Sequence, residues 1–187
     1  DIHIPEGEFL MCHEQLLAAG LTTVTAPDEL PTADEVSYSK KDSPLYIELH
    51  RHLFDSSEDA HDDLNRFFAD FRPVEIDGFL TMPPHEHLLY LILHAYKHFV
   101  NCGIGLRQFC DIGLWASEYH DAIDWQKLYD QCTSVHAATF ASAAFRIATE
   151  YLGIAIELPP LWHTSIDVEP MLHDTLCGGV YGSNDYT

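Results

Sequence analysis

The segment LILHAYKHFVN, from Leu91 to Asn101, decides how this chain is interpreted. Apolar residues recur there and just before it at the spacing of a helix, and they form one continuous stripe: Leu88, Leu91, Ile92, Ala95 and Phe99. Other apolar residues widen the stripe over most of the circumference, so we expect a largely buried helix. The remaining strip is polar and carries His94, Lys97 and His98.

The two histidines stand one helical turn apart, which is how a helix can offer two ligands to zinc. A zinc protease would place a glutamate after the first histidine as general base, and this chain has Ala95 there. The cation of Lys97 also disfavours a second cation nearby. We therefore favour two other interpretations: polar groups satisfied by acids such as Asp111, or a strip that lines a binding site. A histidine-based metal enzyme that uses His94 and His98 is a third alternative.

The part of the chain before this helix mixes strands and helices. β-Branched or alternating residues predict strands in four segments: DIHIP, LTTVTAP, EVSYS and LYIELHRHLF. Between the first two, a helical pattern ends at Gly20, which is typical of a helix C-cap. A further helix is predicted to begin at Ser56 or Ser57, and an irregular or hairpin segment is predicted around Asp77-Gly78.

From Pro84 onward the pattern is helical. We expect four helices, at residues 84–101, 106–119, 125–134 and 137–152. The sequence thus predicts an α+β protein with an α/β part over residues 1–82 and a helical domain over residues 83–187.

Composition limits the classes of function. Thirty acidic residues against nine basic ones give a formal charge of −21, which repels phosphate backbones and argues against extended nucleic acid as a partner. No run of ~20 apolar residues occurs, so no membrane span is expected. The five cysteines form no CxxC pair, which favours free thiols in a reducing compartment and hence a cytoplasmic protein.

Acidic residues on the predicted strands suggest a metal site. Asp1 and His3 lie on one face of the first strand, and Glu48 lies on a later strand between apolar residues. Carboxylates on adjacent strands can converge on a divalent metal that bridges phosphate oxygens and positions an attacking hydroxyl.

The order of these elements resembles the bacterial uncharacterised nucleotidyltransferase family, of the DNA polymerase β type. That family has a D-x-D strand, an "(I/L)D(L/I)HW"-like strand, an "LxLHxxKH…RLxxLxDIAxL" helix pair and then "DWxxL". This chain reads DIHIP, YIELHRHLF, LILHAYKH, LRQFCDIGLW and IDWQKLY, in that order, over most of residues 1–153.

The resemblance implies metal-dependent transfer of a nucleoside monophosphate from a nucleoside triphosphate (NTP) to a small-molecule or protein acceptor. Asp1 and Glu48 would be the catalytic acids, and they would hold Mg²⁺ or Mn²⁺ together with His3. His50 falls on a further motif position, as does Asp111, for which a structural ion pair is an equal alternative. The residues that would meet the nucleotide lie on the helix pair: Lys97, His94, His98 and Arg107.

Two departures from the family pattern shape these expectations. His3 replaces the second acid of D-x-D, and imidazole suits zinc or manganese better than magnesium. The family's leading strand and Gly-Gly or Gly-Ser turn precede D-x-D, and the sequence begins at that strand. Without them we expect impaired activity and an exposed sheet edge that favours a homodimer. A degenerate, non-catalytic protein that binds nucleotide or a partner is the alternative function.

Overall fold

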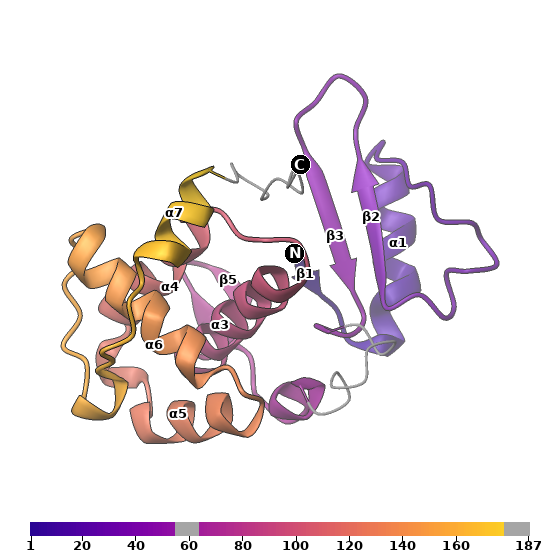
Figure 1. Cartoon of the computed structure of the whole chain (residues 1–187). Helices are drawn as coiled ribbons and strands as arrows, with labels where there is room; N and C mark the ends of the chain where they lie inside the picture. Colours follow the sequence, from indigo (N-terminus) through magenta and orange to yellow (C-terminus); the bar gives the residue numbers. More distant parts are fainter. Residues whose placement is uncertain (55–63, 178–187) are drawn as a thin grey trace. The chain divides into compact units, whose positions relative to one another are not determined.

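The computed structural model describes residues 1–54 and 64–177, which fall into two compact units, Asp1–Ala69 and Asp70–Thr187 (Figure 1). We call them the sheet unit and the helical unit. Their combination of strands and helices confirms the predicted α+β class. The predicted hairpin belongs to the helical unit, and the proposed domain division after residue 82 stays a prediction.

The sheet unit is built on three strands: β1 (Ile2–His3), β2 (Glu35–Ser39) and β3 (Tyr46–His50). β3 is central, with β1 parallel on one side and β2 antiparallel on the other. The register places His3 and Glu35 on either side of His50. Because side chains alternate along each strand, the three residues share one face of the sheet.

The other face of the sheet is apolar and packs against α1 (Phe9–Ala18), which Figure 1 shows running alongside β2. The buried core consists of Phe9, Leu21, Leu30, Val36, Tyr38 and Leu49. His13 is buried in the same region, and its Nδ1 lies 2.7 Å from the Tyr38 hydroxyl. Gly20 ends α1 with a φ of 84°, as the sequence predicts.

Two strand predictions need correction. LTTVTAP is not a strand: Thr22 alone forms a bridge, to Ser39, and Val24 is fully exposed, so its β-branched side chain has no sheet to pack on. The strand in LYIELHRHLF ends at His50, after which the chain bends. The predicted helix start at Ser56 or Ser57 lies outside the described residues.

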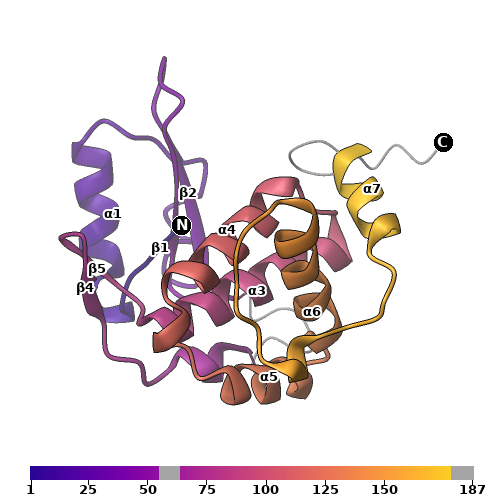
Figure 2. The same ribbon diagram turned by 90° about the vertical axis from the view of Figure 1, so that its left-hand side faces the viewer.

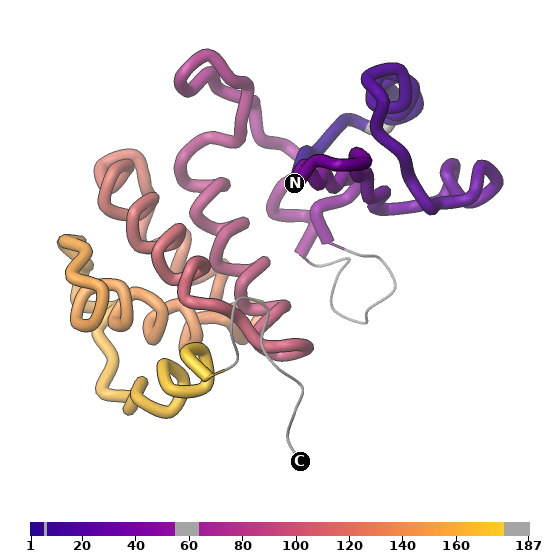
Figure 3. The backbone as a smooth tube through the Cα atoms, turned by 90° about the horizontal axis from the view of Figure 1, so that it is seen from above, coloured from indigo at the N-terminus to yellow at the C-terminus, as the bar shows by residue number. Residues whose placement is uncertain are grey.

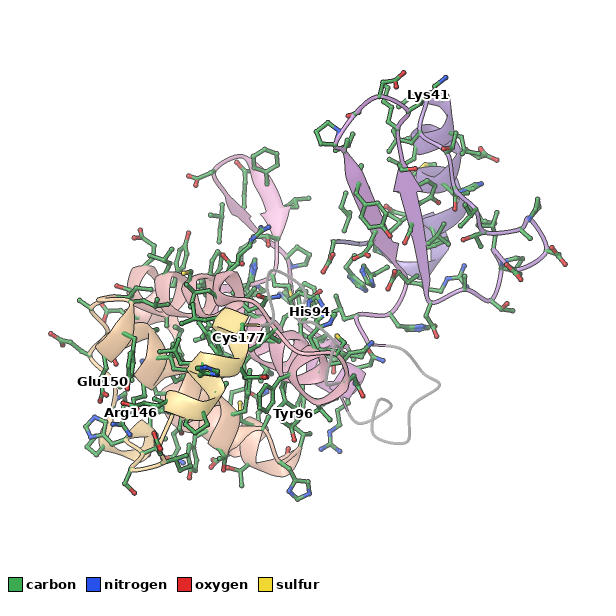
Figure 4. All side chains as sticks on the ribbon, turned by 45° about the horizontal axis from the view of Figure 1, so that its top comes forward. Lys41, His94, Tyr96, Arg146, Glu150 and Cys177 are labelled. Atoms are coloured by element: carbon green, nitrogen blue, oxygen red, sulfur yellow. The ribbon has the colours of Figure 1, made fainter. Side chains whose placement is uncertain are left out.

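The helical unit begins with the predicted hairpin, β4 (Val74–Ile76) and β5 (Phe79–Thr81). Asp77 and Gly78 have φ values of 52° and 83°, the left-handed conformations that a type I′ turn requires. Figure 3 and Figure 4 show the hairpin projecting from the helices that follow, and Phe79 and Leu80 are mostly exposed.

The predicted helices are confirmed with small changes at their ends. They are α3 (Pro84–Asn101), α4 (Leu106–Glu118), α5 (Trp125–Ser134) and α6 (Ala138–Arg146). Asp124 caps α5 by accepting a hydrogen bond from the Lys127 amide. A π-helical turn, Ile147–Tyr151, continues α6, and a helix that the sequence did not predict, α7 (Glu169–Cys177), follows later. None of the described helices combines the length and the apolar character needed to cross a membrane.

Figure 2 shows α3, α4 and α6 packed side by side, and the contacts among them define the core of this unit. Gly113 on α4 lies close to the chain that follows α6. A Cβ at Gly113 would lie 2.7 Å from Ala148 and 2.9 Å from Ile154, too close for either contact. The glycine therefore lets α4 lie against the π-helical turn and the chain just after it.

Candidate functional site

The polar face of the sheet carries the main cluster of potential ligands. Glu48 and His50 flank Leu49 on β3, and Leu49 is buried in the core, so the other two side chains point to the opposite face. Asp1 precedes β1 and reaches the same face. One donor atom each from Asp1, Glu48 and His50 lie within 4.8 Å of one another. Among residues 1–54 and 64–177, these three residues form the one group of this kind.

His50 lies between two carboxylates. Its Nε2 is 4.0 Å from Asp1 Oδ1, and its Nδ1 is 3.9 Å from Glu35 Oε2. The imidazole is buried, whereas Asp1 is exposed and Glu48 is half-buried. The cluster thus has a buried side, at His50, and a side that solvent can reach, at Asp1.

Glu48 is the electrostatically perturbed acid of this face. Burial raises the pKa of its carboxyl group above the ordinary value, and the negative charge of Glu35 raises it further. Both effects oppose the charged carboxylate. A bound cation would offset both effects, so Glu48 is well placed to act as a ligand to a cation.

His3 lies beside this cluster but is not a member of it. It pairs with His50 in register, and its imidazole is hydrogen-bonded to the backbone of Arg51. Burial is the main reason that its pKa is lowered, so the neutral form is favoured. Its role as a third metal ligand stays a prediction.

The donor set fits a divalent metal ion. Two carboxylates and one imidazole are ligands for Mn²⁺ or Zn²⁺, and the carboxylates alone suit Mg²⁺. With bonds of about 2.1 Å, donor atoms around one ion are roughly 3–4 Å apart, so the present spacing needs only a small contraction.

The other predicted site residues belong to the helical unit. His94 Nε2 is 2.7 Å from His98 Nε2 on α3, and the Lys97 carbonyl accepts a hydrogen bond from the Asn101 side chain. On α4, Arg107 lies 3.4 Å from Asp111, which confirms one of the ion pairs that the sequence suggested. Arg107 is largely exposed, and the nucleotide contacts of these residues stay predictions.

Sequence reasoning did not assign His50 and Glu35 to the cluster. The signal for His50 was present, because Glu48 and His50 are two residues apart on a strand and therefore share a face. Glu35 requires the register of β2 against β3, which the sequence does not specify by itself.

Carboxylates that converge on one face of a mixed sheet suit a divalent metal ion and the phosphate groups that it binds. The family model described as "Uncharacterised nucleotidyltransferase" matches residues 1–153, and the chain belongs to this family. No curated protein and no solved structure matches the chain significantly.

Proposed function

We propose that this protein transfers a nucleoside monophosphate from a nucleoside triphosphate to a hydroxyl of a small molecule or a protein side chain. The observation that carries the proposal is the convergence of Asp1 and Glu48, which are far apart in sequence, within 4.8 Å of each other and of His50. Family membership supports the reaction class.

In the transfer, the acceptor oxygen forms a bond to the α-phosphorus. The bond from the α-phosphorus to the oxygen that bridges it to the β-phosphorus breaks, pyrophosphate leaves, and the hydroxyl proton passes to solvent or a base. Such reactions depend mainly on positioning and charge neutralisation. A divalent metal held by Asp1, Glu48 and His50 would neutralise phosphate charge. Mn²⁺ suits this mixed donor set better than Mg²⁺ because one donor is an imidazole.

The family's motif positions on α3 and α4 supply the candidates for contacts to the triphosphate. Lys97 forms no salt bridge among the described residues, so its ammonium group can donate to phosphate oxygens. His94, His98 and Arg107 are further candidates. The charge of −21 argues against a large nucleic acid as acceptor.

The first test is Mn²⁺ binding by the wild type and by Glu48→Gln, measured by titration calorimetry. We expect Glu48→Gln to weaken binding about 100-fold, because losing even an indirect contact to a metal typically costs 10–100-fold. Because the pKa of Glu48 is raised, affinity should fall as the pH is lowered, starting at a higher pH than for an ordinary glutamate. Glu14→Gln, an exposed acid on α1, is the matched control. Equal affinity in Glu48→Gln and the wild type would contradict the site.

The second test is NTP binding by Lys97→Ala, with Lys41→Ala as control, a lysine in the turn between β2 and β3 (Figure 4). Loss of one charge-assisted hydrogen bond should weaken binding by roughly tenfold or more. The alternative, a non-catalytic nucleotide-binding protein, is favoured by His3 in place of an acid. Binding of triphosphate without transfer to any acceptor would select that alternative.

A further inference from the structure

A second set of donor atoms lies on α3 and at the residue that caps its C-terminal end. His94, His98 and Cys102 follow one another at intervals of four residues. The Nε2 atoms of the two histidines are 2.7 Å apart, and His98 Nδ1 is 3.3 Å from Cys102 Sγ. Residues four apart on a helix are neighbours on its surface, so the helix itself creates this arrangement.

The short distance between the two Nε2 atoms is that of a hydrogen bond between the rings. In a neutral pair, one Nε2 carries a proton and donates it, and the other accepts it with its lone pair. Both nitrogens therefore point toward the same position. A metal ion that takes the place of the shared proton would meet two nitrogen lone pairs there.

The geometry requires little adjustment. Zinc-to-nitrogen bonds are about 2.0–2.1 Å, which places two nitrogen ligands roughly 3.0–3.4 Å apart. The rings therefore need to separate by less than about 1 Å. Tyr90 packs against the His94 ring, with a centroid distance of 5.3 Å, and restricts its orientation.

The pair is accessible from solvent. His94 and His98 are half-buried and Cys102 is exposed. Figure 4 labels His94 and Tyr96, which are two residues apart on α3. Two residues turn a helix by about 200°, so the Tyr96 side chain points to nearly the opposite side from His94. There it packs on Phe140. The donors thus lie on a different face of α3 from the contact between Tyr96 and Phe140.

We propose that His94 and His98 form a metal site for a borderline divalent ion, such as Zn²⁺, Ni²⁺ or Cu²⁺. Two imidazoles suit these ions better than they suit Mg²⁺, although the nearby cation of Lys97 lowers the affinity for any of them. Cys102 positions the His98 ring through Nδ1, as partners beyond the ligands commonly do, and water completes the coordination. This proposal assigns His94 and His98 to a metal ion instead of to the nucleotide, and it uses no residue of the sheet cluster.

The test is Zn²⁺ and Co²⁺ titration of the full chain in the Glu48→Gln background, which weakens the sheet cluster. We expect one ion per chain, with His94→Gln and His98→Gln each weakening binding at least tenfold. His163→Gln, an exposed histidine outside α3, should not change affinity. Unchanged affinity in the double variant His94→Gln/His98→Gln would overturn the proposal.

Two further measurements do not depend on how those variants fold. In ¹⁵N NMR spectra of the histidine rings of the wild-type chain, Zn²⁺ should shift the Nε2 signals of His94 and His98. Excess Mg²⁺ is added so that it occupies the sheet cluster. Zn²⁺ shifts confined to other histidines would overturn the site. Cys102→Ser should weaken Zn²⁺ binding less than either histidine variant does, because the serine hydroxyl can still contact His98 Nδ1. A sulfur-to-cobalt charge-transfer band, lost in Cys102→Ser, would overturn the positioning role and make the thiol a ligand.

Discussion

The two units assemble their donor atoms in different ways. In the sheet unit, Asp1 and Glu48 are separated by most of that unit's sequence and meet only because β1 pairs with β3. In the helical unit, His94 and His98 meet because one turn of α3 brings any such pair together. The sheet cluster therefore depends on tertiary structure, and the α3 pair depends on a single helix.

The chemistry of the two clusters differs as well. The sheet cluster offers two carboxylates and one imidazole, with Glu35 next to them, so it suits hard or intermediate cations. The α3 pair offers two imidazoles with a thiol behind them, so it suits softer ions. We expect Mn²⁺ binding to report on the sheet cluster, and Zn²⁺ binding to report on the α3 pair once the sheet cluster is disabled.

The largest expected effect comes from breaking the tertiary support of the sheet cluster. Leu49 is buried between Glu48 and His50 and forms part of the core under the sheet. Leu49→Ala should cost about 2–5 kcal/mol of stability, because it leaves a cavity in that core. Mn²⁺ binding should be lost with it, while Zn²⁺ binding at α3 persists; parallel titrations of the two metals measure this.

The control for Leu49→Ala is Leu17→Ala on α1, which removes the same atoms from an exposed position and should change little. Far-UV circular dichroism checks that the helices remain. A Leu49→Ala chain that kept wild-type Mn²⁺ affinity would show that the cluster does not depend on the sheet.

The second prediction disturbs the helical unit instead. Gly113→Ala forces a Cβ to within 2.7 Å of Ala148, and overpacking of this kind costs about 1–3 kcal/mol. Thermal unfolding should show the loss. Mn²⁺ affinity at the sheet cluster should stay within about twofold, because the substitution lies in the other unit. The matched change Gly7→Ala, where a Cβ meets nothing, should leave the unfolding temperature nearly unchanged.

The same contrast between local and non-local structure explains what the sequence could predict. The ends of α3 follow from Pro84 and from the helical spacing of its apolar residues. The turn at Asp77-Gly78 follows from the left-handed conformation that these two residue types adopt readily. Both features depend on local sequence, and the sequence therefore indicated both. LTTVTAP has strand-like residues but no partner strand beyond the bridge at Thr22, which no local rule could reveal. Propensity for strands is realised only where a sheet is available.

The candidate site shows this limit residue by residue. Asp1 and Glu48 were predicted from their motif positions, and the structure brings them together. His50 and Glu35 complete the cluster through strand register, which depends on pairings that a single sequence does not fix. The His94 pair needed only a helix, and the sequence indicated it directly.

The smallest expected effect concerns a helical pair that resembles the α3 histidines in spacing but not in environment. Arg107 and Asp111 are four residues apart on α4, 3.4 Å from each other and largely exposed to solvent. Water and salt screen such a pair, so its contribution to stability is about 0.2–0.5 kcal/mol. Asp111→Asn should therefore lower the free energy of unfolding by no more than this, as measured by urea denaturation, and high salt should remove the difference.

A loss of several kcal/mol would mean that Asp111 has a buried partner and that the environment of α4 differs from the one described. Arg107→Gln tests the other role of the pair. If it lowers stability only slightly but weakens NTP binding, Arg107 contributes to nucleotide recognition and not to the stability of α4.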